Sequence, residues 1–507
     1  MLRPSWPNLP QSGVGGVTSS SETTNVTAKT IDSETQVTPK YLTLIIAAAL
    51  SAVSVSASAS GYRFGSQSVS SQGTAEANTA EAADASTVFA NPAGMARLDG
   101  RQIMGGVTAV VPHSTFNDEG STRFTRTSTG GLKSQDDFVP KAVAAPSLYY
   151  TQKINDQWTA GFGMFVPYGT NLSYDWNWTG RYALTNIKLT SVNLNPSISF
   201  KPNEQHAFGF GLNGEYMKAT LGQGVDVPGS VAAAQAAGTG AALLRQIVAA
   251  GGNPAALGAV RDGHASVEGK DWGFGWNVGY LYMPTPDTRF GIAYRSSIKH
   301  ELKGGAIWDF STVTTDAKVN AVLQGASHHV NSAALVELRT PETLSVNGFH
   351  QFNEKWAGMF DVTWTKNSRM ENIDIQFPGT ASGDEVIRQQ WKNTVRVALG
   401  ANYKLNDAVT LRGGIAHDDA PVQSEELRHA ALPDADRVQL SFGANWKVSP
   451  NSSIDLAYSY LDFKDARANY TNLCRPGLTT CTGNGETTRG TWSTHMSLVG
   501  LAYNYKF

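Results

Sequence analysis

The sequence predicts an all-β membrane protein, an antiparallel transmembrane β-barrel whose lumen is closed by an N-terminal plug. Long stretches alternate apolar with polar residues, aromatic residues gather at the ends of the apolar faces, and short turns alternate with long connections. Alternation with a period of two is the pattern of a β-strand. Aromatic strand ends and unequal connections are typical of strands that cross a lipid bilayer.

Composition narrows the class of protein. Among 507 residues, 16% are charged, 10% are aromatic and 50 are glycine, which is too little charge and too much glycine for a typical soluble enzyme. The net charge of −2 gives no support to nucleic-acid binding. A mean hydropathy of −0.25 argues against a bundle of apolar transmembrane helices.

The N-terminal region contains one long apolar stretch. Residues 40–59 have the parts of a secretory signal peptide: Lys40, an apolar core and small residues at a cleavage site before Ser60. The alternative, a membrane anchor, is disfavoured because the core is short and fades into Ser and Ala. Residues 1–39 are polar, and we interpret them as a disordered extension or the product of a mis-assigned start codon.

The two cysteines are Cys474 and Cys481. Export into an oxidising compartment predicts that this close pair forms a disulfide that staples a loop. A metal site would need further ligands at matching spacing, and the neighbouring sequence offers none. The sequence therefore predicts neither a metal site nor a cofactor.

The stretch from residue 271 to residue 282 has the clearest alternation. Its even positions are aromatic or aliphatic and its odd positions are small or polar, and similar patterns recur to the C-terminus. A soluble β-sandwich also alternates, but its buried face prefers Val, Ile and Leu to crowded aromatic strand ends. From about Gln102 onward the length allows 12 to 16 crossing strands, at roughly 25 to 35 residues for each strand and its share of loop. The barrel is expected to span residues 102–507. Its last residue is Phe507, and this ending resembles the terminal strand that outer-membrane proteins present to the barrel-insertion machinery.

The segment 60–101 lacks this alternation and is too polar for a lipid-facing strand. It is therefore expected to fold inside the lumen as a plug. Pro92 cannot continue a helix or donate to a strand ladder, and it biases Asn91 toward an extended conformation. The sequence Asn91-Pro92-Ala93 is thus expected to fix a turn in the plug.

Several motifs, in order along the chain, resemble those of the FadL-type outer-membrane transporters of long-chain fatty acids and other hydrophobic compounds. They are SGYRFGSQSVSSQG, ANPAGM, PYG with WTGRY, NLNPSISFK, DWGFGWNVGYLY, AYRSSIKHELKG, GIAHDDAPV and PDADRVQLSFGANW. The resemblance runs from Gly61 to Phe507. It implies an outer-membrane barrel of 14 strands, a hatch of about 40 residues that closes the periplasmic side, no energy source, and lateral release of ligand at a kinked third strand. We expect the hatch to shift around Ser60 to Phe64 when ligand leaves.

The third strand is expected near residues 159–176. Pro167 removes a ladder donor and Gly169 loosens the backbone, so Pro167, Tyr168 and Gly169 form the expected lateral opening. From the residues alone, a harmless bulge near the outer rim is an equal alternative, and the resemblance favours the opening.

The longest connection is expected over residues 221–270. Its Ala- and Leu-rich part carries Leu243, Leu244 and Ile247 at helical spacing and is bounded by Gly and Pro. These side chains are predicted to capture an apolar ligand at the outer rim. Helices that merely pack together as a lid are the alternative.

A fatty acid would need a cation for its carboxylate. Candidates are Lys218, Arg388 and Lys392. Strand parity also turns a further set of arginines toward the lumen, where a salt-bridge network is the simpler role: Arg289, Arg295, Arg396 and Arg412. The position of the family's head-group arginine appears as Gln223, which favours the alternative that the ligand is a neutral aromatic hydrocarbon such as toluene.

Other functions fit less well. An outer-membrane enzyme would need a Ser, His and acid set, and the only such stretch, around His417, belongs to a transporter motif. An open porin conflicts with the plug, and a purely structural barrel would need neither plug nor broken strand. The sequence therefore predicts a non-enzymatic, diffusion-driven transporter, monomeric and without a nucleic-acid partner.

Overall fold

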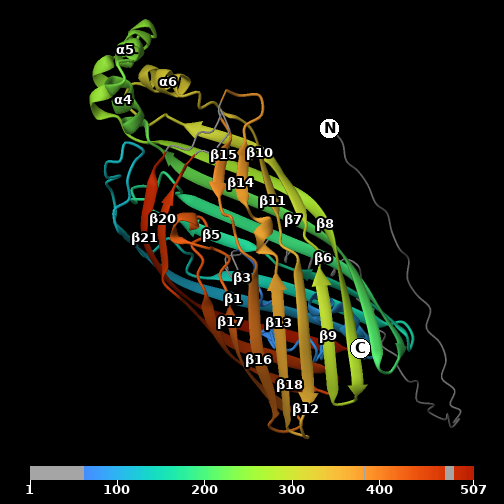
Figure 1. Cartoon of the computed structure of the whole chain (residues 1–507). Coiled ribbons are helices and arrows are strands. Elements are labelled where there is room, and N and C mark those ends of the chain that lie inside the picture. The colour runs from blue at the N-terminus through green and yellow to red at the C-terminus, as the bar shows by residue number, and fades with distance from the viewer. Residues whose placement is uncertain (1–61, 382, 474–484) are drawn as a thin grey trace, which may run out of the picture. The chain divides into compact units, whose positions relative to one another are not determined.

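The computed structural model describes residues 62–381, 383–473 and 485–507 (Figure 1). The chain divides into two compact units, Met1–Ala48 and Ala49–Phe507, and all described residues belong to the second. The predicted extension, the signal peptide, Ser60 and the Cys474–Cys481 pair lie outside the described residues.

The described strands form one antiparallel sheet that closes on itself. The first strand, β1, pairs with the last, β21, along one edge and with β3 along the other. The strands are β1 (Arg101–Asp118), β2 (Ser134–Gln135), β3 (Val143–Lys153), β4 (Trp158–Phe165), β5 (Gly169–Ser173), β6 (Asn186–Asn203), β7 (His206–Val225), β8 (Gly263–Thr285), β9 (Thr288–Arg295), β10 (Lys299–Asp309), β11 (Ser332–Arg339), β12 (Thr343–Gln351), β13 (Trp356–Thr365), β14 (Asn372–Gln376), β15 (Glu385–Arg388), β16 (Thr394–Lys404), β17 (Val409–Asp418), β18 (Arg437–Ser449), β19 (Ser452–Phe463), β20 (Ala466–Thr471) and β21 (Thr487–Lys506).

These segments make a barrel of 14 crossing strands, because several crossings are interrupted. One crossing each is formed by β4 with β5, β9 with β10, β11 with β12, β13 with β14, β15 with β16, and β19 with β20, while β2 is a short extension paired with β1. The all-β membrane fold, with 14 antiparallel strands, is thus confirmed.

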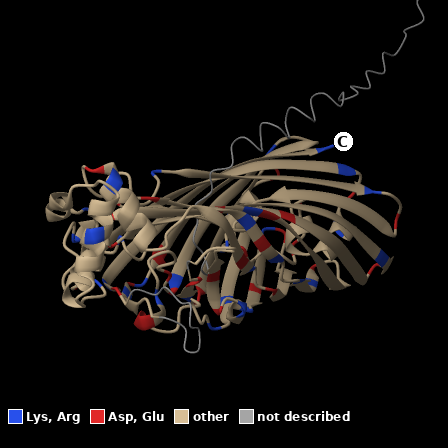
Figure 2. Cartoon of the chain, turned by 90° about the horizontal axis from the view of Figure 1, so that it is seen from above, with Lys and Arg blue, Asp and Glu red and all other residues tan. Residues whose placement is uncertain are grey.

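The alternation follows from which face of the wall each side chain occupies. In β8, Trp272, Phe274 and Trp276 are 49%, 77% and 42% exposed on the outward face, whereas Asn277 and Leu281 are buried on the inward face. Long stretches of the strands carry few charged residues (Figure 2). An uncharged outward face with aromatic ends suits contact with lipid.

The two rims differ as predicted. Two-residue turns such as the one between β6 and β7 lie on the rim where the chain ends, and there the Phe507 N–H donates to the Arg101 carbonyl at 2.9 Å. The helices of the long connections stand at the opposite end (Figure 1). They are α4 (Val227–Ala236), α5 (Gly240–Ala249), η2 (Pro254–Ala259) and α6 (Ala317–Ala326).

The longest connection is shorter than the predicted range of 221–270. Backbone pairing between β7 and β8 continues from Leu221↔Val267 to Val225↔Gly263, so the connection covers only residues 226–262. The sequence prediction failed here because the strands extend beyond the lipid-facing band, where apolar alternation is no longer required. No helix within the described part of the chain is both long and apolar enough to span a bilayer.

Candidate functional site

The segment from Tyr62 to Gly100 lies inside the barrel. It contains three short helices, α2 (Val69–Gln72), α3 (Thr87–Ala90) and η1 (Pro92–Arg97). The Gln72 side-chain amide donates to the carbonyl of Leu498 in β21 at 3.1 Å, and the Asn91 amide donates to that of Tyr280 in β8 at 3.1 Å. Because β8 and β21 stand far apart around the wall, the segment spans the lumen between them.

Asn91 connects α3 to η1, and Pro92 and Ala93 are the first two residues of η1. Asn91 is extended, with φ −154° and ψ 105°, and its side chain accepts from the Ala93 N–H at 3.0 Å while Pro92 starts the helix. An Asx cap followed by proline at the first helical position is a favoured helix start. Gly279 permits this approach, because a Cβ there would lie 1.9 Å from the Asn91 side-chain oxygen.

Arginines of the wall hold the plug in place, as their inward parity predicts. Arg289 donates to the Ala80 carbonyl at 3.0 Å and Arg295 to the Phe89 carbonyl at 2.9 Å. Arg396 donates to the Ala75 carbonyl at 3.0 Å and pairs with Glu76, and Arg412 pairs with Asp455. All four arginines already have partners. Arg396 and Arg412 form ion pairs, as in the predicted salt-bridge network, whereas Arg289 and Arg295 bond to main-chain carbonyls of the plug instead.

The third crossing is interrupted where Pro167 stands. Its segment β4 ends at Phe165 and β5 begins at Gly169. Consequently β3 pairs with β4 only from Leu148 to Lys153, and no strand within the described residues pairs with the rest of that edge of β3, residues 143–147. Proline has no N–H to donate to a ladder, so the wall loses its continuity at this level.

The start of the plug covers this interruption. The Phe64 N–H donates to the Pro167 carbonyl at 2.8 Å, and the Gly169 N–H donates to the Tyr62 carbonyl at 2.9 Å. These bonds make a single antiparallel bridge between Arg63 and Tyr168. The rings of Tyr62 and Tyr168 lie 5.2 Å apart. The Gln67 side-chain amide also donates to the Val166 carbonyl at 2.7 Å and accepts from the Val166 N–H at 3.2 Å. A short stretch of the plug, through its main chain and the Gln67 side chain, therefore replaces the missing ladder.

Beyond the plug, toward the long connections, the lumen is filled by a large cluster of buried apolar side chains. Ile247 of α5 is fully buried in it and Leu243 packs against it, whereas Leu244 is 43% exposed. Leu243 and Ile247, four residues apart, thus share the buried face of the helix, and Leu244 lies on its exposed side. This helix joins the outer surface to the apolar lumen.

The basic candidates are dispersed. Lys218 is wrongly assigned to a lumen site, because it lies on the outward face of β7 and its Nζ is 2.8 Å from Glu268 of β8. Lys392 is exposed in the gap between β15 and β16. Arg388 is half-buried, and its Nη2 donates to the Thr471 carbonyl at 3.1 Å. Of the three residues Lys218, Arg388 and Lys392, only Arg388 is set among buried residues.

Two residues beside Arg388 escaped the sequence prediction. Gln389 is fully buried and Trp391 is 3% exposed. Within the described residues, the Arg388 Nε, both polar atoms of the Gln389 amide and the Trp391 indole Nε1 lack hydrogen-bond partners. Gln390 between them has φ +44°, which is strained for a residue other than glycine. Unused donors beside a strained residue are typical of a binding site, but no spacing motif in the sequence signals them.

Acidic groups near the outer mouth also escaped prediction. Gln223 of β7 donates to the Glu385 carboxylate of β15 at 3.1 Å, and Asn472 donates to the Glu486 carboxylate at 2.9 Å. Glu486 precedes β21, and burial raises the pKa of its carboxyl to about 8. These residues are distant in sequence and meet only because the barrel closes.

We expect the raised pKa of Glu486 to make the outer loops less stable as the pH rises. A carboxyl whose pKa is raised on folding stabilises the folded state fully at a pH below its ordinary pKa. This contribution is lost as the pH rises through the folded-state pKa of about 8. Each unit of pKa shift corresponds to about 1.4 kcal/mol in the free energy of unfolding. Calorimetry of the detergent-solubilised protein should therefore show a melting temperature that falls between pH 5 and pH 9 more steeply for the wild type than for Glu486→Gln. Glu425→Gln, at an exposed loop carboxylate, is the control; parallel profiles for all three proteins would contradict the assignment.

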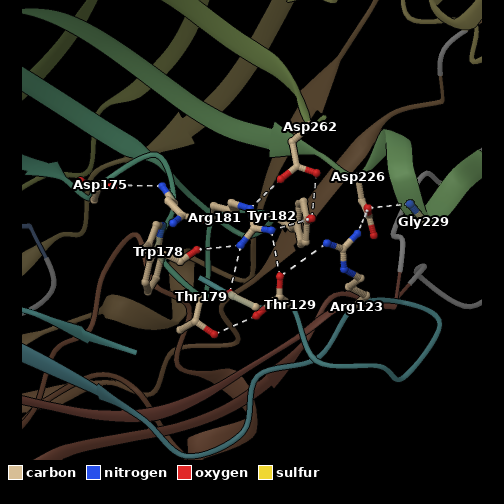
Figure 3. Close-up of polar contacts among 12 residues, drawn as sticks. Arg123, Thr129, Asp175, Trp178, Thr179, Arg181, Tyr182, Asp226, Gly229 and Asp262 are labelled. Atoms are coloured by element: carbon tan, nitrogen blue, oxygen red, sulfur yellow. Dashed lines mark hydrogen bonds and ion pairs between the residues drawn. The ribbon is translucent and has the colours of Figure 1, made fainter. Parts of the chain in front are cut away.

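A polar network joins three of the connections on the outer rim (Figure 3). Arg181, from the WTGRY motif, donates to Asp262 at 2.7 Å and to the Thr129 carbonyl at 2.9 Å. The Tyr182 hydroxyl donates to Asp262 at 2.9 Å, and Arg123 pairs with Asp226 at the start of α4. Charge-assisted bonds of buried groups thus fix the loops above the apolar cluster.

Comparisons with known proteins agree with this architecture. Residues 50–507 match the family model described as outer membrane protein transport protein (OMPP1/FadL/TodX). Outer membrane protein P1 of Haemophilus influenzae is 30% identical, over 92% of this chain and all of that protein. The long-chain fatty acid transport protein of Escherichia coli K12 is 26% identical, over 84% of this chain and 92% of that protein.

Solved structures share the fold. A Pseudomonas aeruginosa FadL homologue superposes with a TM-score of 0.74 at 23% identity, covering 88% of this chain and 100% of that chain. The Pseudomonas putida toluene transporter TodX gives 0.58 at 17% identity, covering 83% of this chain and 94% of that chain. The match over nearly the whole chain, the closed barrel and the broken third strand lead to one conclusion: the chain belongs to the OMPP1/FadL/TodX family of outer-membrane proteins that transport hydrophobic compounds.

Proposed function

We propose that this protein takes up long-chain fatty acids by diffusion and releases them sideways through the interrupted third strand. The observation that carries the proposal is the break at Pro167, which leaves part of the β3 edge without a strand partner among the described residues. The main chain of Tyr62–Phe64 and the side chain of Gln67 bond to the broken strand there. A barrel wall whose strands are all paired leaves no way out sideways, so a break covered by a few residues of a plug is a natural exit.

Capture would take place on α5. Leu244 and Val248 are 43% and 61% exposed at the outer rim, while Ile247 of the same helix belongs to the buried apolar cluster. An acyl chain that adsorbs on the exposed side would therefore lie next to the buried apolar cluster. Concave, mostly apolar surfaces with a few placed polar groups are the usual form of a small-molecule site.

The carboxylate of the ligand would be held beside the interruption between β15 and β16. Arg388 supplies a cation, and the unused donors of Gln389 and Trp391 would complete the hydrogen bonds that a carboxylate requires. The Trp391 ring lies 6.0 Å from the ring of Tyr62. A head group bound there would reach the residues that mask the exit, so binding could displace them.

The exit would open when Tyr62–Phe64 moves. A cavity of about 100 Å³ borders this stretch and is lined by Arg63, Gln67, Glu76 and Arg295 among others. Space beside the masking stretch favours a local shift over expulsion of the whole plug. The remaining plug would stay anchored by the wall arginines.

A neutral aromatic hydrocarbon is the second candidate ligand. Gln223 and the carboxyl groups of Glu385 and Glu486 near the outer mouth would not attract a carboxylate. A ligand without charge would pass them without penalty. The pathway and exit would be the same for both ligand classes.

Binding of labelled oleate and labelled toluene distinguishes these ligands. We expect Arg388→Ala to weaken oleate binding about 10- to 100-fold, since a hydrogen bond to a charged group contributes about 1.5–3 kcal/mol, and to leave toluene binding unchanged. Lys392→Ala, at the exposed neighbouring cation, is the matched control and should leave both unchanged. If Arg388→Ala leaves oleate binding unchanged and toluene still binds, the protein would be assigned to hydrocarbon uptake.

A further inference from the structure

Three lysines form a row across the outward face of the barrel wall. Lys218 of β7 lies directly opposite Lys270 of β8, and Lys270 lies directly opposite Lys303 of β10. We call Lys218, Lys270 and Lys303 the lysine row. Like charges that face each other on neighbouring strands destabilise a sheet, so three in line call for an explanation.

The row lies at the outer edge of the lipid-facing band. Trp272, two residues from Lys270 on the same face, pairs across the strands with Tyr216, and their rings are 5.5 Å apart. Phe274 and Trp276 then continue the apolar outward face toward the other rim. Aromatic girdles mark the membrane interfaces of such barrels. The lysine row therefore stands just beyond the girdle, at the level of the lipid head groups.

The rim next to the row faces the outside of the cell. β7 continues past Lys218 into the long connection of residues 226–262, whereas the short turns and the C-terminus occupy the opposite rim. Outer-membrane barrels carry their long loops outside and their short turns in the periplasm. The lipid beside the row is thus the outer leaflet.

Protein carboxylates neutralise the row only in part. Lys218 pairs with Glu268 at 2.8 Å, and Lys303 is 3.8 Å from Glu301. For Lys270, in the middle, the described residues supply no ion pair. Further exposed charges on the same outward face are Lys188, Lys299, Glu337 and Arg339, so basic groups outnumber acidic ones.

We propose that the lysine row binds the phosphate groups of a phosphorylated glycolipid in the outer leaflet. Ammonium groups at head-group depth donate to phosphate oxygens, and each basic residue near an anionic membrane surface contributes favourably. A phosphate placed over Lys270 would remove the repulsion along the row. The apolar surface that continues directly below it would hold the acyl chains of the same lipid.

A lipid fits this surface better than a protein partner. The aromatic and aliphatic side chains beneath the row are exposed on the outward face, which in such barrels is the face that contacts hydrocarbon chains. The charges and the apolar surface are stacked along the membrane normal, in the order of head group and acyl chains. This arrangement matches one amphipathic lipid molecule.

The test uses the full refolded barrel in detergent, with bisphosphorylated lipid A and its dephosphorylated form as probes and native mass spectrometry as the measurement. We expect the variant with Lys218, Lys270 and Lys303 all changed to Gln to bind bisphosphorylated lipid A about tenfold or more weakly than the wild type. The wild type should discriminate against dephosphorylated lipid A by a similar factor.

A control variant carries Lys355→Gln, Lys404→Gln and Lys447→Gln, which remove three exposed lysines from the short-turn rim. It should bind as the wild type does. Equal binding by the wild type and the row variant, or equal binding of the two lipids, would overturn the proposal. Lys270→Gln alone, with heat-modified gel mobility as a check of folding, gives a milder variant in case the triple change prevents refolding.

Discussion

A disulfide between Arg63→Cys and Tyr168→Cys is expected to abolish uptake while leaving ligand binding at the outer rim intact. These residues form the single antiparallel bridge between the plug and the interrupted strand. The flanking hydrogen bonds, Phe64 to Pro167 and Gly169 to Tyr62, make them a non-hydrogen-bonded pair. Side chains of such a pair are close, and the geometry suits a disulfide.

The bond would fix the main chain that covers the break at Pro167, so a ligand could enter but not leave sideways. Uptake of labelled oleate by cells is the measurement, in a background with Cys474→Ser and Cys481→Ser so that only the engineered bond can form. Reduction of the same protein is the control, because it restores movement without changing the sequence. Undiminished uptake by the oxidised protein would refute lateral release at the break beside Pro167.

Gly414→Val is expected to displace the plug and leave a conducting pore. A Cβ at Gly414 would lie 2.2 Å from the carbonyl carbon and oxygen of Thr74 and 2.7 Å from the Ala75 nitrogen. These are main-chain atoms, so no side-chain rotation relieves the overlap. Ala75 and Glu76 already have φ of 50° and 55°, which leaves this turn little freedom to adjust. Overpacking of this kind costs about 1–3 kcal/mol or more.

Single-channel conductance in planar bilayers measures the effect. The wild type should stay near background, and Gly414→Val should show openings because the turn at Thr74 no longer fits between the strands. Gly413→Val is the matched control: it lies next to Gly414 on the same strand, and a Cβ there meets nothing within 4 Å. If the Gly414→Val protein folds but shows no conductance, the plug can be rearranged within the lumen without opening it.

Two parts of the N-terminal segment are held to the wall in different ways. Tyr62–Phe64 is bound to the wall by main-chain bonds to the interrupted strand, whereas the residues that follow are held by Arg289, Arg295 and Arg396. The proposed transport step moves the first part and keeps the second in place. The two variants above therefore fail in different ways, one by blocking exit and one by opening the lumen.

Much of the fold was present in the sequence because its cause is local. Alternation in each strand reports which side chains face lipid, and the aromatic strand ends report the membrane interfaces. Pro167 signals a break in the wall by its missing N–H, and Asn91-Pro92-Ala93 fixes a helix start within the plug. The same alternation should have excluded Lys218 from the lumen, since Phe208, Phe210 and Leu212 on that face of β7 are exposed.

The sequence by itself determined the barrel, the inserted plug and the position of the broken strand. Only the tertiary structure decided which distant residues meet: Gln223 with Glu385 near the mouth, Arg388, Gln389 and Trp391 among the lumen residues, and Lys218 with Lys270 and Lys303 on the outer wall. The physical reason is that strand register and barrel closure set these pairings. Register depends on the summed fit of all neighbouring strands, and no short stretch of sequence encodes it.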